Sequence, residues 1–231
     1  MKYRVLMMVT VACMLLVFAG CGGGGGGTGR YTLPGELPTG GTGTGSSTGT
    51  GVSGETDPEA LTLSAWDDFK YGAHSSAIAK FNQVLGTANI TDRQKAEAYN
   101  GLGWAQTKSS GAESAISAFS QASSLLDEAR VGLAAAMIQR GQRSGFLQAI
   151  QLLEQVNLGN TATRFTSTHP IGVSNAEAHA LLAFAYFWRA SPGDDAKARN
   201  QITVARTEDP ATDSSVAQIY QTLRSLGLSG I

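Results

Sequence analysis

The sequence predicts an all-α domain that follows a short apolar leader and a glycine-rich tether. Three observations lead to this prediction. Apolar residues recur with a helical period over the second part of the chain, which is rich in Ala and Leu. Glycine is concentrated between Gly22 and Gly54, where 15 of the 29 glycines lie. A continuous apolar run fills residues 5–19. We therefore expect a leader, a tether and a helical domain over residues 1–20, 21–58 and 59–231.

The composition excludes one class of partner. The chain has 231 residues, a formal net charge of -1 and only 15% charged residues, which suits one soluble domain with additional segments. No basic stripe is present that would neutralise phosphates. We therefore expect no nucleic-acid partner.

The leader has the features of an export signal. Lys2 and Arg4 precede the apolar run of residues 5–19, and two small residues follow it before Cys21. A membrane-spanning helix needs about 20 apolar residues, so this run suits the hydrophobic region of a signal peptide.

The junction "FAGC", Phe18 to Cys21, resembles the lipobox of bacterial lipoproteins, with Phe18 where that family usually has an aliphatic residue. The resemblance implies that Cys21 carries diacylglycerol, that the chain is cleaved before it, and that the new amino terminus is acylated. Two or three acyl chains anchor a protein stably, so membrane lipid is the first expected partner. The same resemblance implies that Gly22, in place of Asp after the cysteine, favours the outer over the inner membrane of the cell envelope. A plain secretory signal with an incidental cysteine is the alternative.

The tether is expected to be disordered. Residues 22–58 are mainly Gly, Thr and Ser, and they cannot offset their ordering entropy by burial. A glycine-rich coil of about 35 residues spans roughly 30 to 35 Å. Tyr31, Leu33 and Leu37 either mark a short docking motif or have no role. The run of glycines fits a dinucleotide fingerprint formally, but no strand precedes it, so we expect no cofactor there.

The best-patterned helical stretch is "AEAYNGLGWAQTKSSGAESAISAFSQA", residues 96–122. In it, Leu102 and Gly103 are followed by Ala115 and Phe119. This spacing is similar to that of the tetratricopeptide repeat, in which two antiparallel helices form each unit. Gly103 would let the two helices approach closely, and Phe119 would fill the space one turn away.

The same alanine-to-bulky spacing recurs at Ala77, Ala149 and Ala198. The resemblance implies a tetratricopeptide-like (TPR-like) helical hairpin solenoid of about four hairpins. The first helices are expected at 59–70, 92–108, 126–141 and 174–190. The second helices are expected at 73–86, 112–124, 146–157 and 194–207. A capping helix over 213–226 would close the array. An all-helical domain of another family is the alternative, because such pairs occur in any amphipathic helix.

The interval between the last two alanines contains an insertion, residues 158–173, with the sequence "LGNTATRFTSTHPIGV". Loops longer than about 12 to 15 residues are uncommon in compact domains and are often functional. We hypothesise that Arg164, Phe165 and His169 contact a partner or cover the groove. An ordinary surface loop is the alternative.

No pattern of reactive residues predicts an enzyme. None of the three histidines has the spacing of a metal site. Asp67-Asp68 and Asp194-Asp195 suit helix ends, where negative charge complements the helix dipole. No serine lies in a nucleophile elbow. We expect no catalytic residue, no metal and no cofactor.

Binding is the remaining function class. The tetratricopeptide resemblance implies that the first helices line a concave groove that holds an extended peptide or a partner helix. The candidate groove residues are Trp66, Phe69, Asn100, Trp104, Lys108, Gln139, Phe184 and Trp188. Packing between helices is the alternative role for the tryptophans.

The sequence therefore favours a lipid-anchored, non-enzymatic adaptor that holds another envelope protein or peptide, whose identity the residues do not indicate. The alternative is a ligand-capture lipoprotein in which Trp66, Trp104 and Trp188 stack on glycan or another small solute. A spacer without a specific client is a third possibility.

Overall fold

A computed structural model describes residues 57–231, and this part of the chain is all-α. Its nine helices form consecutive antiparallel pairs, which confirms the predicted fold class at that level. The first helices of the pairs are α2 (Pro58–Lys70), α4 (Asp92–Ser110), α6 (Asp127–Gln139) and α8 (Asn175–Arg189). The second helices are α3 (His74–Leu85), α5 (Ala112–Ala122), α7 (Arg143–Gln155) and α9 (Asp194–Glu208). The last helix is α10 (Ser215–Ser225). The predictions for the leader, Cys21 and most of the tether lie outside the described residues.

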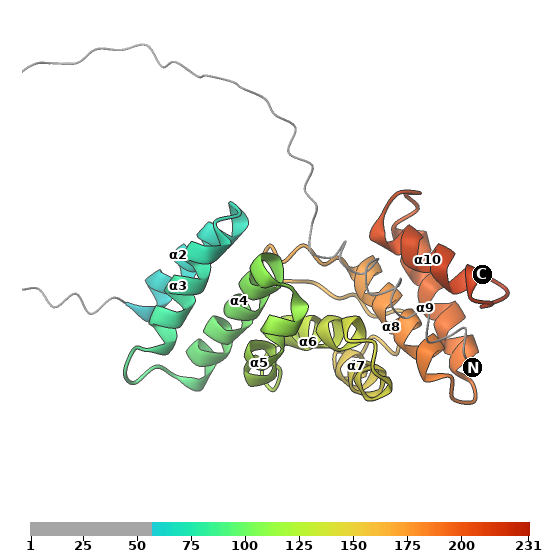
Figure 1. Ribbon diagram of the computed structural model, residues 1–231, viewed down its shortest axis with the longest axis horizontal. Helices are drawn as coiled ribbons and strands as arrows, with labels where there is room; N and C mark the ends of the chain where they lie inside the picture. The colour runs from blue at the N-terminus through green and yellow to red at the C-terminus, as the bar shows by residue number, and fades with distance from the viewer. Residues whose placement is uncertain (1–56) are drawn as a thin grey trace, which may run out of the picture.

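The pairs follow one another along an arch from α2 to α10 (Figure 1). Each helix packs against the next, and the first helices also contact one another in the order α2, α4, α6, α8. We call the surface formed by these four helices the inner face. Within residues 57–231, no helix combines the length and the hydropathy that a membrane crossing requires.

Two of the first helices begin with a reciprocal cap. Thr91 accepts a hydrogen bond from the main-chain N–H of Gln94, and the Gln94 side chain accepts one from the main-chain N–H of Thr91. Ser174 and Glu177 make the same arrangement at the start of α8. Because such caps satisfy donors that have no partner within the helix, they define where α4 and α8 begin.

Two phenylalanine rings lie directly on the backbone of the neighbouring first helices. A Cβ atom added at Gly103 of α4 would lie 2.6 Å from Cδ1 of Phe119, and one added at Gly132 of α6 would lie 2.5 Å from Cζ of the same ring. Phe81 occupies the corresponding position against Gly101 of α4. Both rings are fully buried. The expected close approach at Gly103 is thus found, but Phe119 lies on Gly103 itself rather than one turn away, and the same ring also contacts the next pair at Gly132.

Substituting Gly132→Ala should destabilise the fold, although alanine favours helix over glycine by about 1 kcal/mol. The added methyl group would overlap the Phe119 ring, and forcing extra volume into a packed core typically costs about 1–3 kcal/mol. Urea denaturation would measure the change in the free energy of unfolding.

Gly86→Ala is the matched control, since Gly86 ends α3 with φ -83° and its added Cβ would meet no atom closer than 3.5 Å. This control should change stability by less than about 1 kcal/mol. A Gly132→Ala variant more stable than the parent chain would contradict the close packing of the Phe119 ring against Gly132.

Candidate functional site

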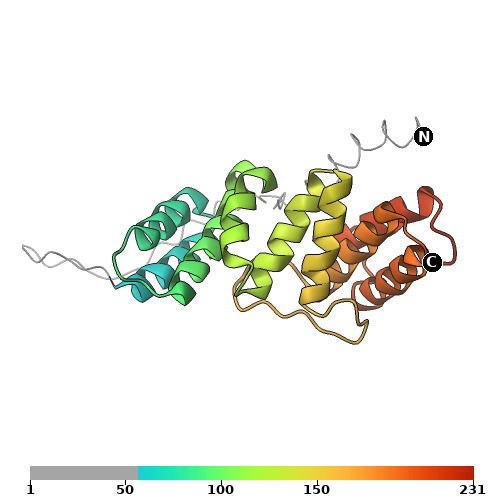
Figure 2. The ribbon, with the colours of Figure 1, turned by 90° about the horizontal axis from the view of Figure 1, so that it is seen from below.

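Residues 158–173 connect α7 to α8 and contain no helix. The segment runs back alongside α6 toward α4 before it returns to α8 (Figures 1 and 2). Four of its apolar side chains belong to the helical core: Leu158, Phe165, Ile171 and Val173. The insertion is therefore an integral part of the fold, and it covers part of the inner face.

A buried histidine ties the start of the segment to α8 and α9. His179 Nδ1 lies 2.5 Å from Oε1 of Gln201, and its Nε2 lies 3.1 Å from the main-chain oxygen of Thr163. Gln201 donates a hydrogen bond of 2.8 Å to the main-chain oxygen of Leu158. These contacts give His179 a structural role, since both of its ring nitrogens are engaged in holding the chain.

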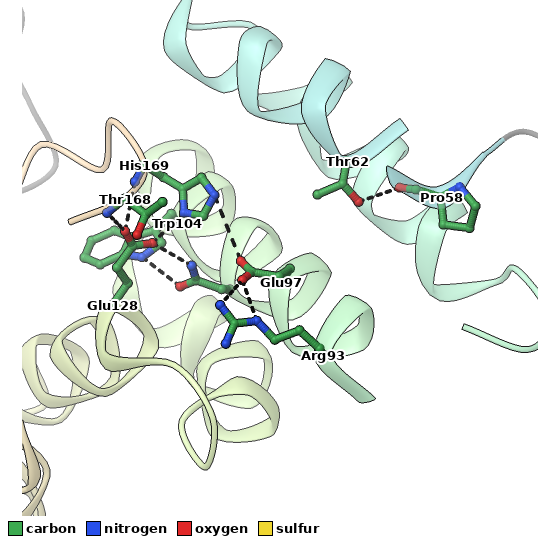
Figure 3. Close-up of polar contacts among 9 residues, drawn as sticks. Pro58, Thr62, Arg93, Glu97, Trp104, Glu128, Thr168 and His169 are labelled. Atoms are coloured by element: carbon green, nitrogen blue, oxygen red, sulfur yellow. Dashed lines mark hydrogen bonds and ion pairs between the residues drawn. The ribbon is translucent and has the colours of Figure 1, made fainter. Parts of the chain in front are cut away.

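The middle of the segment is bound by a buried carboxylate, Glu128, near the start of α6 (Figure 3). One carboxylate oxygen accepts the main-chain N–H groups of Thr168 and His169, the latter at 2.9 Å. The other oxygen lies 2.7 Å from Nδ1 of His169 and accepts a hydrogen bond of 2.8 Å from the Asn100 amide. Glu128 is only 6% exposed, so these four contacts replace the water that a carboxylate would otherwise bind.

The ring of His169 lies flat on an indole. Its centroid is 3.9 Å from that of Trp66, with an angle of 9° between the planes. Nε2 of the same ring lies 4.0 Å from Oε2 of Glu97 on α4, beyond hydrogen-bond distance. Glu97 also pairs with Arg93 one turn earlier. His169 therefore lies between two carboxylates and against one aromatic face.

Asn100 and Trp104 support Glu128 from α4. The Trp104 indole N–H donates a hydrogen bond of 3.1 Å to the Asn100 side-chain oxygen, which leaves the Asn100 amide nitrogen to donate to Glu128. Trp104 also packs edge-on against Phe119, with ring centroids 5.1 Å apart. The orientation of the Glu128 site is therefore coupled to the core contact between the helix pairs.

The contacts keep Glu128 ionised. Burial alone would raise its pKa, but hydrogen bonds from the His169 ring, the His169 main chain and Asn100 outweigh burial and lower the pKa below the ordinary value. Because the ionised carboxylate accepts at both oxygens, Nδ1 of His169 carries a proton.

The structure brings together four of the sequence-predicted residues, namely Trp66, Asn100, Trp104 and His169. Lys108 lies farther along α4, close to Gly172 of the segment. Its pKa is lowered because the ammonium group is partly buried, and the charge of Glu177 partly offsets this effect. All of these residues lie along the path of the inserted segment.

The remaining predicted residues lie elsewhere. Phe69 is buried edge-on against Trp66. Phe184 and Trp188 pack with Phe146, and the Trp188 ring is stacked on that ring at 6.0 Å. Gln139 lines a small hollow between α5 and α6.

Two residues at the start of the segment have different roles. Phe165 is an anchor in the core, whereas exposed Arg164 pairs with Glu208. Trp66 and Trp104 are 5% and 3% exposed, so neither offers a free ring face, whereas Trp188 is partly buried with its ring stacked on Phe146.

No sequence pattern singles out Glu128 or Glu97. An acidic residue in the first turn of a helix is usually explained by the helix dipole, and Glu128 has that position in α6. Its partners lie 28 and 41 residues away in the chain. No local spacing could have indicated them.

The comparisons with known proteins do not assign the chain to a family. No protein-family model matches the sequence. No curated protein matches it significantly. Within residues 57–231, no group of three or more His, Cys, Asp or Glu side chains is arranged to hold a metal ion.

The lowered pKa of Glu128 predicts a pH dependence of stability. A carboxyl group whose pKa is lower in the folded state stabilises the fold above its ordinary pKa of 4.5, and this contribution is lost as the pH falls through the folded-state value. Glu128→Gln should therefore lower the free energy of unfolding by about 1–3 kcal/mol at pH 7 and flatten its decline below pH of about 4.5.

Denaturation at a series of pH values would test this prediction. Glu113→Gln is the matched control, because the Glu113 side chain is 65% exposed in its pair with Arg140 and such pairs contribute at most about 1 kcal/mol. The prediction fails if Glu128→Gln retains the acid dependence of the parent chain.

Proposed function

We propose that this chain is a lipid-anchored, non-enzymatic adaptor of the cell envelope, whose inner face holds an extended segment of another protein. The observation that supports the proposal most is that the inner face already binds an extended segment through main-chain N–H groups, at Glu128. Main-chain donors are common to all peptides, so the same acceptor can receive a partner.

The resemblance to tetratricopeptide repeats supports the same proposal. Proteins of that family bind peptides on the surface formed by the first helices, and here those helices are α2, α4, α6 and α8. Three of the predicted groove residues, Trp66, Asn100 and Trp104, lie at the Glu128 site. The burial of Trp66 and Trp104 favours protein binding over the capture of glycan or solute.

The proposed anchor is Cys21, carrying acyl chains in the outer membrane, with the following glycine-rich segment as a tether. Mass spectrometry of the mature protein should show a diacylglyceryl group and an acylated amino terminus on Cys21. Cys21→Ser should release the protein from the membrane fraction, because the buried acyl chains supply the membrane affinity. Retention of the serine variant in that fraction would contradict the anchor.

The adaptor role can be tested by photo-crosslinking with the full-length, lipidated chain in its own membranes. A crosslinker at Thr166 or Pro170, both exposed on the inserted segment, should capture one envelope protein. The same crosslinker at Ser120 of α5 or Gln151 of α7, both exposed on second helices, is the matched control and should not. Equal capture from all four positions, or from none, would contradict the proposal.

Oligosaccharide titration separates the adaptor from the capture alternative. Tryptophan fluorescence should stay unchanged, because Trp66 and Trp104 are buried and the Trp188 ring is stacked on Phe146.

A further inference from the structure

Residues 166–170, "TSTHP", form a short span between two buried anchors. Phe165 before it is 9% exposed and Ile171 after it is fully buried. Within the span, Thr166, Thr168 and Pro170 are exposed. The span therefore rests on the inner face through a few contacts, while the anchors on either side hold the rest of the segment in the core.

Those few contacts are ones that a second peptide could make. Two are hydrogen bonds that main-chain N–H groups donate to Glu128. The third contact is made by the His169 ring, which stacks on Trp66 and binds the same carboxylate. Because Pro170 follows His169, the backbone of His169 is restricted to an extended conformation, which suits this mode of binding.

Glu128 favours an occupied site, because the span supplies most of its hydrogen bonds. Without the span, this buried carboxylate would keep only the Asn100 amide as a donor. Leaving a buried charge without donors is strongly unfavourable. When the span leaves, water or another chain must replace these donors, so a chain that supplies equivalent donors can take its place.

With His169 in place, two polar atoms of the site have no hydrogen-bond partner in the described part of the chain. Within residues 57–231, neither Oε2 of Glu97 nor the indole N–H of Trp66 has a hydrogen-bond partner, and both atoms are buried. His169 Nε2 approaches this Glu97 oxygen only to 4.0 Å. A side chain with more donors in one plane could reach both carboxylates at once.

Arginine has the chemistry that the two carboxylates and the Trp66 ring face require, although it offers no acceptor to the Trp66 N–H. Its guanidinium is planar, it stacks on aromatic rings, and it carries five N–H donors in a rigid fork suited to carboxylates. Placed on Trp66, it could donate to Glu97 and Glu128 together. Lysine has no flat face, and a neutral ring cannot serve two carboxylates equally well.

We propose that Trp66, Glu97 and Glu128 form a binding site for an arginine-bearing extended peptide, and that residues 166–170 occupy it internally until such a peptide takes their place. The identity of the peptide as part of a client protein rests on the adaptor function proposed above. The internal span is tethered at both ends, so it competes at an effective concentration in the millimolar range. A peptide in solution must overcome this competition.

The first experiment uses labelled peptides with the sequence of residues 164–173, carrying histidine, arginine or alanine at the position of His169. Fluorescence anisotropy would measure their binding to the full mature chain and to an open variant, Thr168→Pro with His169→Ala, which loses one N–H donor and the ring but keeps both anchors. The arginine peptide should bind the open variant at least tenfold more tightly than the alanine peptide and at least tenfold more tightly than it binds the parent chain.

Adding Glu128→Gln to the open variant should weaken binding of the arginine peptide at least tenfold. Adding Glu113→Gln, which changes an exposed ion pair, should leave this binding unchanged. Equal binding of the arginine and alanine peptides, or no binding to a folded open variant, would overturn the inference.

A second measurement does not depend on the open variant. In the full chain, His169→Ala should lower the midpoint of thermal unfolding, while His169→Arg should keep or raise it, because arginine fills the same site. An arginine variant as unstable as the alanine variant would also overturn the inference.

The two proposals fail separately. If photo-crosslinking captures a partner from the inner face but no peptide binds the open variant, the internal occupant is rejected and the adaptor stands. If the arginine peptide binds but no partner is captured, the site stands and the adaptor role is rejected.

Discussion

Phe119 lies between α4 and α6, with the backbone of Gly103 on one side and of Gly132 on the other. This contact brings three helices from two successive pairs together without an intervening side chain. One pair earlier, Phe81 makes one such contact, with the backbone of Gly101 on α4. Because packed interiors tolerate little change in volume, these rings determine how closely the helices of the inner face approach.

The spacing of the inner helices has a direct consequence for the polar site. Asn100 and Trp104 project from α4 and Glu128 from α6, and they meet in a chain of hydrogen bonds that ends at the main chain of Thr168 and His169. A wider separation of α4 and α6 would break the bond between Asn100 and Glu128. The apolar contact through Phe119 therefore positions a charged group that would otherwise be costly to bury.

The inserted segment combines two kinds of attachment, and they have different consequences. Its apolar anchors, Phe165 and Ile171, hold the ends by burying apolar surface, and this stabilisation does not depend on the orientation of the contacting groups. Its polar middle depends on donors that must be aimed at Glu128. Buried polar networks are stable only when all their members are satisfied, which makes the middle selective for what occupies it. The inner face thus binds main-chain groups of the inserted segment of the same chain.

Much of the fold was predictable from the sequence, because the signals for a helix come from residues that are close together in the chain. The alanine and phenylalanine spacing and the caps at Thr91 and Ser174 involve residues only three or four apart, and Gly103 meets Phe119 within one helix pair. The predicted helices agree closely with those of residues 57–231. The sequence also indicated that residues 158–173 were an insertion of unusual length, and it singled out His169.

Only the tertiary structure decided what His169 does. Its partners, Trp66, Glu97 and Glu128, come from three different helices. In the chain, Glu97 lies 72 residues before His169 and Glu128 lies 41 residues before it. No periodic pattern connects such positions, because the insertion reverses its course over the inner face. Local physical chemistry therefore determined the helices and their pairing, whereas the long-range path of one segment determined which surface is covered and by what.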